Sequence, residues 1–399
     1  MNSFKYLSKL TAVAAIALAG VSCESLYDYE GDCDPHYYIK FEYDMNMEFA
    51  DAFKEQVECV NLWVFDKQTG DCVKHIYTPV ADLEAYNYLL PLDIDPGQYN
   101  FVAWCGDIDN RHFTHQGASV SKHEAATCRL SKRGVEAEEG SPNIGMATSS
   151  DDLDLIFHGK LNEATLPTWA TLMAAVDESA RPGGSAYQFI PEYKCSYMWD
   201  ELAQQHKVVY TVPLVRDVNN ITLTIQHHNG PMNTTFKRVT MIDNNGMMLH
   251  DNSVDVSDEN IVFKPWALSV GTLAGNSFGD PDGDYLDQTF SRGGAGDPSA
   301  EHDFMKVELS TARLMADHDP YITIYDIETG NTVFSFPVVQ WLCQLRSAKY
   351  SGMSDQEYLD RKYDHELYVI LEDDGRGGWT AISVVINGWH IIENGTVVL

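Results

Sequence analysis

Two histidines are placed where they could begin a zinc-dependent hydrolase motif. His365 and His123 are each followed by glutamate, which opens the pattern His-Glu-x-x-His. In that pattern two histidines one helical turn apart bind zinc, and the glutamate acts as general base. Val369 and Thr127 stand where the second histidine is needed. Neither segment is therefore predicted to bind zinc.

An acidic segment resembles a calcium loop only in part. Asp280–Asp284 has carboxylates at alternate positions, but Tyr285 replaces the turn glycine and Ser291 the closing glutamate. The pattern predicts an acidic turn. There is also no GxSxG elbow and no P-loop, and Gly375–Gly378 cannot complete GxGxxG because Thr380 holds the last place.

The remaining polar groups give no better candidate for catalysis. His112 and His115 could face one another on a turn, although two histidines in a loop are more often solvated than bound to metal. With 59 acidic residues, carboxylate pairs are too common for any one to be chosen as a hydrolase dyad. The sequence predicts no catalytic residue, no metal site and no cofactor, and so no enzyme.

Cys23 is the residue for which the sequence does indicate chemistry. Two lysines precede the apolar run Leu10–Val21, which is too short for a stable membrane span. A basic start, a short apolar stretch and a cysteine at the cut are typical of lipoprotein export signals, so we expect a diacylglyceryl thioether on Cys23. Gly20 departs from the bacterial lipobox, which usually has leucine there. The alternative is a soluble periplasmic protein cut near Ser22.

The predicted processing defines the N-terminal organisation. Residues 1–22 form the signal peptide, and residues 23–36 form an acidic tether without an apolar core. Several acyl chains on Cys23 would anchor the protein stably, at about 0.8 kcal/mol per buried methylene. Acids directly after a lipidated cysteine resemble the surface-export signal of lipoproteins in some Gram-negative anaerobes. We expect a lipid-anchored, surface-exposed protein of the cell outer membrane.

Composition narrows the class further. The net charge of −32 repels phosphate backbones and argues against nucleic acid as a partner. The length and the 44% hydrophobic content suggest two domains with real cores. Of eight cysteines, seven remain beside Cys23, so at least one stays unpaired within the monomer. A disulfide from Cys33 to a later N-terminal cysteine is an open alternative in an oxidising compartment.

Alternation of apolar and polar residues predicts a mostly β chain. Strands with period two are expected at Tyr37–Tyr43, Val60–Val64 and Tyr99–Ala103. Trp63, Trp104 and Trp389 sit within strand patterns, which favours core packing over sugar platforms. Further strands are predicted at Leu153–Gly159, Val208–Val215, Ile221–Ile225, Arg238–Ile242, Ile322–Ile327, Thr332–Val339, Leu367–Leu371, Ile382–Trp389 and Thr396–Leu399.

Strand spacing and glycine-rich turns suggest two antiparallel β-sandwiches, because there is no βαβ rhythm. We expect an N-terminal domain over residues 37–204 and a C-terminal domain over residues 205–399. Short helices are predicted in the second domain at Gln340–Lys349 and Asp355–Lys362. Ser354 and Glu357 form a capping box, and Leu359 and Tyr363 lie four apart on one helical face, with Tyr358 at its edge.

Eight segments occur in a specific order and spacing across the mature chain. They are Phe41–Phe53, Val60–Asp66, Pro96–Gly106, Leu155–Gly159, Val212–Ile225, Ala312–Leu314, Gln356–Asp364 and Ile386–Trp389. Together they resemble one protein family, the FimB-like fimbrial anchor subunits of Gram-negative anaerobes.

The resemblance implies an all-β protein of two tandem transthyretin-like antiparallel sandwiches with short helices in the second. Such a protein stays tethered by lipid, holds the first fimbrial stalk subunit by strand completion, and can limit the length of the fimbria. We expect the contact at a sheet edge of the C-terminal domain, with the terminal segment Glu393–Leu399 as one candidate. Thr396–Leu399 could equally complete its own sandwich. The alternatives are a surface glycan-binding lipoprotein and a tip or accessory fimbrial subunit.

Overall fold

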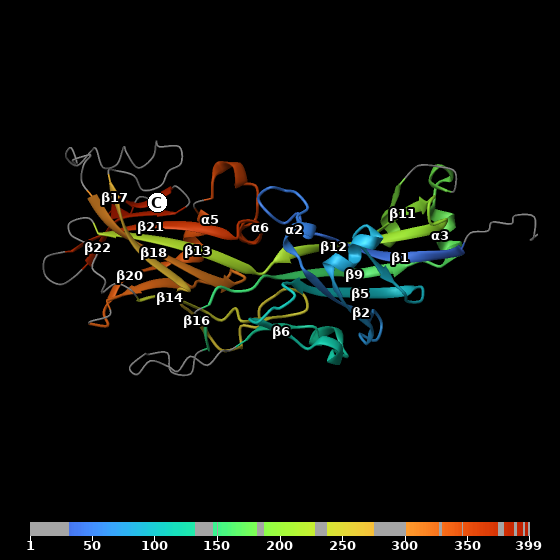
Figure 1. Ribbon diagram of the computed structural model, residues 1–399, viewed down its shortest axis with the longest axis horizontal. Helices are drawn as coiled ribbons and strands as arrows, with labels where there is room; N and C mark the ends of the chain where they lie inside the picture. Colours follow the sequence, from blue (N-terminus) through green and yellow to red (C-terminus); the bar gives the residue numbers. More distant parts are fainter. Residues whose placement is uncertain are drawn as a thin grey trace, which may run out of the picture. The chain divides into compact units, whose positions relative to one another are not determined.

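The computed structural model describes residues 32–131, 147–149, 151–181, 187–227, 238–274, 301–326, 329–344, 346–373, 379–386, 389–393 and 396–397 (Figure 1). Strands dominate these residues and the helices are short, so the chain is mostly β, as predicted. The chain forms two compact units. The first contains residues up to 39, 91–96 and 165–210, and the second contains 40–90, 97–164 and the chain from 211 onward.

In the first unit, three strands form an antiparallel ladder around a histidine. β10 (Gln188–Ile190) pairs with β11 (Cys195–Asp200), which pairs with the first half of β12 (Gln205–Arg216). Buried His206 lies among the rings of Trp169, Tyr197 and Trp199, and its Nδ1 is 2.8 Å from the Tyr197 hydroxyl. Aromatic side chains from β11 and α3 (Trp169–Ala175) therefore pack around His206 of β12.

In the second unit, β2 (Cys59–Asp66) is the centre of a sheet. It pairs antiparallel with β3 (Cys72–Pro79) on one side and β5 (Gly97–Gly106) on the other. All but the last residue of β2 are buried, which explains its near-continuous apolar sequence. Trp63 and Trp104 are fully buried and donate from their indole nitrogens to backbone carbonyls, so their predicted core role is confirmed.

Two larger sheets complete the second unit. The first has seven strands in the order β17 (Ala267–Ala274), β18 (Glu301–Ala312), β13 (Val218–His227), β21 (Asp364–Asp373), β22 (Trp379–Ile386), β23 (Trp389–Glu393) and β24 (Thr396–Val397). The second has five strands in the order β20 (Thr332–Pro337), β19 (Tyr321–Tyr325), β14 (Arg238–Asp243), β16 (Ile261–Phe263) and β8 (Ala147–Ser149).

The sheets are not purely antiparallel, which corrects the expectation from the sequence. β13 runs parallel to β21, and β16 runs parallel to β8. A parallel pair needs a long connection, and the chain between β13 and β21 contains β14 to β20 and ends with α5 (Val338–Gln344) and α6 (Asp355–Arg361). These helices therefore connect β20 of the five-stranded sheet to β21 of the seven-stranded sheet.

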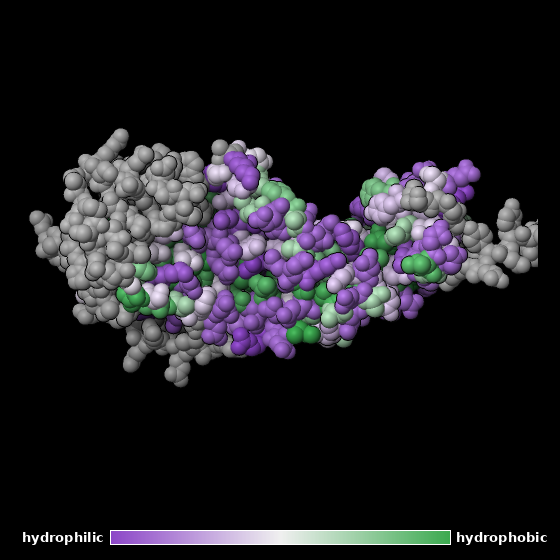
Figure 2. Space-filling model, turned by 45° about the horizontal axis from the view of Figure 1, so that its top comes forward, coloured by the Kyte–Doolittle hydropathy of each residue, from purple (hydrophilic) through white to green (hydrophobic). Residues whose placement is uncertain are grey.

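One hydrophobic core extends through the second unit. Its buried side chains come from the β2 and β5 face, from a small sheet, and from both larger sheets. The small sheet is β6 (Phe113–His115), β7 (Cys128–Leu130) and β15 (Met247–Met248). On the surface, hydrophilic residues dominate the coloured part of the face shown in Figure 2.

Two of the remaining elements are strands of 11 residues, β1 (Asp32–Glu42) and β9 (Ile156–Leu166). The others are short: α2 (Phe53–Gln56), β4 (Leu89–Leu92) and α3 (Trp169–Ala175), with 3₁₀ turns at Val80–Tyr86, Gly117–Ser119, His123–Ala125, Glu178–Ala180, Pro191–Tyr193 and Ala348–Tyr350.

The predicted helix near the C-terminus is largely confirmed. The backbone N–H of Glu357 donates to the Ser354 hydroxyl over 3.1 Å, which is one half of the capping box, and Tyr358 and Leu359 are buried. Tyr363 lies beyond the end of α6, so its expected place on the helical face is wrong. The strand expected at Thr332–Val339 is too long by two residues, because α5 begins directly after Pro337.

A glycine at the end of β5 gives the first test of this packing. A Cβ at Gly106 would overlap the carbonyl oxygen of Leu155, and backbone cannot move aside as a flexible side chain can. We predict that Gly106→Ala lowers the free energy of unfolding by about 1–3 kcal/mol in urea titration. Gly352→Ala is the control, since a Cβ there meets nothing within 4 Å. Equal stability of the two variants would contradict the packing described.

Candidate functional site

The residues first considered for chemistry do not come together. Cys23, Asp280–Asp284 and Gly375–Gly378 lie outside the described residues. His112 contacts Asp154 at 2.9 Å instead of facing His115. No group of three or more histidine, cysteine or acidic side chains within the described ranges could hold a metal ion.

Two further findings concern the membrane and the cysteines. No helix among the described residues has the length and apolar character to cross a membrane. The six cysteines whose pairing the structure describes are all free: Cys59, Cys72, Cys105, Cys128, Cys195 and Cys343.

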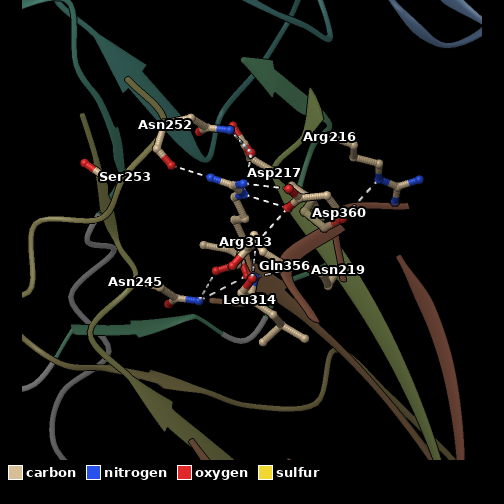
Figure 3. Close-up of polar contacts among 12 residues, drawn as sticks. Arg216, Asp217, Asn219, Asn245, Asn252, Ser253, Arg313, Leu314, Gln356 and Asp360 are labelled. Atoms are coloured by element: carbon tan, nitrogen blue, oxygen red, sulfur yellow. Dashed lines mark hydrogen bonds and ion pairs between the residues drawn. The ribbon is translucent and has the colours of Figure 1, made fainter. Parts of the chain in front are cut away.

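A buried polar cluster in the second unit joins distant parts of the chain (Figure 3). This Arg313 cluster consists of Arg313, Asp217, Asn252, Gln356 and Asp360. Arg313 donates to both carboxylate oxygens of Asp360, from Nε over 2.8 Å and from Nη2 over 2.7 Å. Nη1 donates to the carbonyl of Asn252, and Nε is 3.7 Å from Asp217 Oδ1. The fork-like pairing with Asp360 is the geometry in which arginine binds carboxylate most strongly.

Amide side chains hold the backbone on either side of Arg313. Gln356 donates from Nε2 to the carbonyl of Leu314 (3.1 Å) and to Asp360 Oδ1 (2.9 Å). Asn219 Oδ1 accepts from the Leu314 N–H over 3.0 Å. Asn245 Nδ2 donates to the carbonyls of both residues that precede Leu314. The segment after β18 is therefore fixed by side chains and not by a sheet partner.

The cluster unites three of the segments that carry the family resemblance. Asp217 and Asn219 come from Val212–Ile225, Arg313 from Ala312–Leu314, and Gln356 and Asp360 from Gln356–Asp364. The sequence marks these segments but not their contact. The available signal is that arginine, aspartate and amide residues interrupt otherwise apolar strand ends.

Asp217 has the most unusual electrostatic environment of the cluster. Its side chain is fully buried, and burial raises its pKa to about 7 against the pull of Arg313. Asn252 donates to Oδ1 over 3.0 Å, whereas Oδ2 has no hydrogen-bond partner in the described part of the chain. Since Asp360 already neutralises Arg313, the carboxyl of Asp217 gains little by ionising.

A second polar feature is a layer of histidines against the β2–β5 core. His75 and His115 pack on Trp63, His123 packs on Phe65, and His158 packs on Trp104. Burial lowers the pKa of each, and for His158 to about 3. These rings therefore pack as neutral aromatic groups, and the rings of His112 and His365 are buried too.

The outer edge of the seven-stranded sheet is the clearest surface feature. β17 is the last strand on one side, and β24 is the last on the other. Trp266, Leu268 and Val270 occur at alternate positions there and are 39%, 39% and 51% exposed. They form the β17 stripe, an apolar row beside a strand edge that no other described strand pairs with.

Known proteins resemble this chain in sequence and in fold. A family model for the fimbrillin-A associated anchor proteins Mfa1 and Mfa2 matches residues 29–174 and 200–395. No curated protein sequence matches the chain.

Solved structures share the fold at low identity. A candidate adhesin from Bacteroides thetaiotaomicron has 21% identity and a TM-score of 0.64, covering 90% of this chain and 99% of that one. A candidate polysaccharide-binding protein from the same organism has 23% identity and a TM-score of 0.59, and the match covers 89% of this chain and 96% of that one. The fimbrial anchor protein Mfa2 from Porphyromonas gingivalis has 14% identity and a TM-score of 0.55, and the match covers 90% of this chain and 100% of that one.

The two aspartates of the Arg313 cluster should respond differently to substitution. Asp360→Asn leaves Arg313 buried without its main counter-charge, so we predict a loss of about 3–5 kcal/mol of unfolding free energy at pH 7. Asp217→Asn should have a pH-dependent effect instead. With the folded pKa near 7 and the unfolded value near 3.8, the unfolded state releases the proton first, so wild-type stability falls as pH rises through that window.

Urea titration of both variants at about pH 4.5 and pH 8 measures this contrast. Asp217→Asn should exceed the wild type only slightly at the lower pH, where the window has just been entered, and by more at the higher pH, because the amide never ionises. If Asp217→Asn is instead destabilised at pH 8 as strongly as Asp360→Asn, Asp217 is a permanent charged partner of Arg313 and the description of the cluster is wrong.

Proposed function

Because this chain belongs to the family of fimbrillin-A associated anchor proteins, we propose that it is a lipid-anchored subunit that tethers the fimbrial shaft to the outer membrane and limits its length. The family is one of structural fimbrial proteins and not of enzymes, and it implies association with fimbriae at the cell surface. The observation that carries the proposal is the family match over most of the chain, together with a lipoprotein signal ending at Cys23.

The lipid attachment rests on the N-terminal sequence. The export signal and the cysteine at its end supply the acylation site, and the acidic residues after it favour surface exposure. The strand β1 begins at Asp32, so the expected tether 23–36 is shorter than predicted, and the stretch from Cys23 to Asp32 can span at most about 30 Å between the lipid and the folded units. Lipid on Cys23 would thus leave the rest of the protein free to hold a partner.

The contact with a stalk subunit is proposed at the edge of β17. A strand from the partner could pair with the outer edge of β17, which no other described strand occupies, gain main-chain hydrogen bonds along it, and cover the β17 stripe. β17 and β24 each pair with one neighbour, but β17 has eight residues and β24 has two. The longer edge offers more main-chain hydrogen bonds, so β17 is the better-supported contact.

The tandem domain arrangement is part of the same proposal. We propose two transthyretin-like sandwiches over residues 37–204 and 205–399. The seven-stranded and five-stranded sheets support a sandwich in the second of them, because all their strands except β8 come from residues 205–399 and their buried side chains pack together.

Lipid anchoring is tested with Cys23→Ala in cells. We predict that a fimbrillin-like stalk protein co-purifies with the wild type from gently solubilised outer membranes, and that cells with the variant shed fimbriae into the medium. An intact, lipidated N-terminus on the purified wild type separates an anchor from a tip or accessory subunit. Purification of the protein alone, from cells that keep their fimbriae, would refute anchoring.

The β17 contact is tested by placing charge on the edge. Leu268→Lys with Val270→Lys should reduce the recovered stalk protein about tenfold while leaving the melting temperature unchanged, since both side chains are exposed. The matched control is Val73→Lys with Tyr77→Lys on β3, the edge strand of another sheet with similarly exposed apolar residues. Equal recovery from both double variants would exclude β17 as the contact.

A further inference from the structure

A pocket in the second unit lies between two segments more than 300 positions apart in the sequence. Its volume is about 320 Å³, which is at the lower end of the range for small-molecule sites. One wall is the loop after β1 together with α2, and the other is the turn between α6 and β21. The lining residues are Asn46, Met47, Glu48, Ala50, Ala52, Gln56, Arg361, Lys362, Tyr363 and Asp364.

The loop wall is held in shape by its own side chains. Asn46 is buried, and its Nδ2 donates to the carbonyls of Tyr43 (3.0 Å) and Ala50 (2.7 Å). Its Oδ1 accepts from the N–H of Glu48 over 3.0 Å. Asp51 Oδ1 accepts from the N–H of Tyr43 over 3.0 Å. The wall is therefore preorganised, which lowers the entropic cost of binding.

An aromatic side chain projects from the tip of this loop. Phe49 is 53% exposed and has a φ of 53°, a conformation that bulky residues rarely adopt. Its ring lies 4.5 Å from the guanidinium of Arg361, which is itself held by Glu357 (3.0 Å) and by the carbonyl of Asp44 (2.8 Å). Strained backbone conformations of this kind are often found at ligand-binding sites.

The polar groups of the pocket are balanced between donors and acceptors. Arg361 and Lys362 donate, Glu48 and Asp364 accept, and the amide of Gln56 does both. Neither sign of charge dominates, so the lining does not select an anion or a cation. Apolar atoms make up the larger part of the lining, to which Met47, Ala50 and Ala52 contribute. The one lining aromatic, Tyr363, has the guanidinium of Arg216 over its ring at 4.0 Å.

We propose that this pocket binds a neutral saccharide. Sugar hydroxyls both donate and accept hydrogen bonds, which matches the polar part of the lining. The apolar face of a pyranose can pack on its apolar part, and the exposed ring of Phe49, which lies between the lining residues Glu48 and Ala50 in the sequence, can extend this surface at the rim. Arg361 acts as a positioning residue, because it holds Phe49 and the loop while lining the pocket. This site is independent of the lipid on Cys23 and of the β17 stripe, so it would serve glycan recognition beside anchoring.

The test is saturation-transfer-difference NMR on the full chain in detergent. The probes are glucose, galactose, mannose and N-acetylglucosamine and their disaccharides, each at about 10 mM because a small open site predicts weak binding. We expect at least one probe to bind. Phe49→Ala should weaken it about tenfold and Phe49→Tyr should retain it, whereas Phe189→Ala, at another exposed phenylalanine, should have no effect.

Lys362→Ala provides a second variant on the opposite wall, in case the loop rearranges without Phe49. It should weaken the same probe while leaving the melting temperature unchanged. Absence of binding by every probe would overturn the proposal, as would binding that survives both Phe49→Ala and Lys362→Ala. Binding of glucuronate without any neutral sugar would also overturn it. None of these results bears on stalk recovery, so the anchor proposal stands or falls separately.

Discussion

The buried pairing of Arg313 with Asp360 is the constraint on which much of the second unit depends. A guanidinium that is almost fully buried costs several kcal/mol to desolvate unless a counter-charge and hydrogen bonds meet it. That requirement brings the end of β18, the helix α6 and the loop at Asn252 to one point. Asp217 and the amides of Asn219 and Gln356 then complete the surroundings.

The same pairing orients the surface around it. Asp360 points inward to Arg313, so its neighbour Arg361 turns toward the loop after β1 and donates to the carbonyl of Asp44. The pocket beside Phe49 is therefore a consequence of how α6 is fixed. The start of β21, which pairs parallel with β13, is placed as well, because α6 directly precedes it in the chain. One internal ion pair thus links the sheet order to a surface feature.

Local patterns were sufficient for much of the fold. The alternation in Val60–Val64 predicted a strand, and the burial of Trp63 and Trp104 followed from it. The capping residue Ser354 predicted where α6 begins. The parallel pairing of β13 with β21 was not predictable, because period two specifies a strand but not its neighbour. The extent of β20 was misjudged because Val338 and Val339 favour strands by propensity but start a helix here.

The functional features also divide into those that local sequence predicts and those that depend on the folded chain. Cys23 can be proposed as a lipidation site from a linear motif alone, since its chemistry depends on neighbours in sequence. The β17 stripe and the pocket could not, because each depends on which residues remain exposed after the sheets form. Phe49 was read only as part of the segment Phe41–Phe53, and nothing in its local sequence indicates a φ of 53° or the guanidinium of Arg361 beside it. The segments of the Arg313 cluster were recognised, but their contact was not.

A double-mutant cycle on Arg313 and Asp360 measures whether their ion pair holds the end of β18 and the helix α6 together. Arg313→Met and Asp360→Leu are made singly and together, and their unfolding free energies are compared by urea titration. We expect the double variant to regain much of the stability lost by either single variant, because each single variant leaves one buried charge without its partner. The coupling energy should be about 2 kcal/mol or more. Additive losses would show that the pair does not hold these segments together.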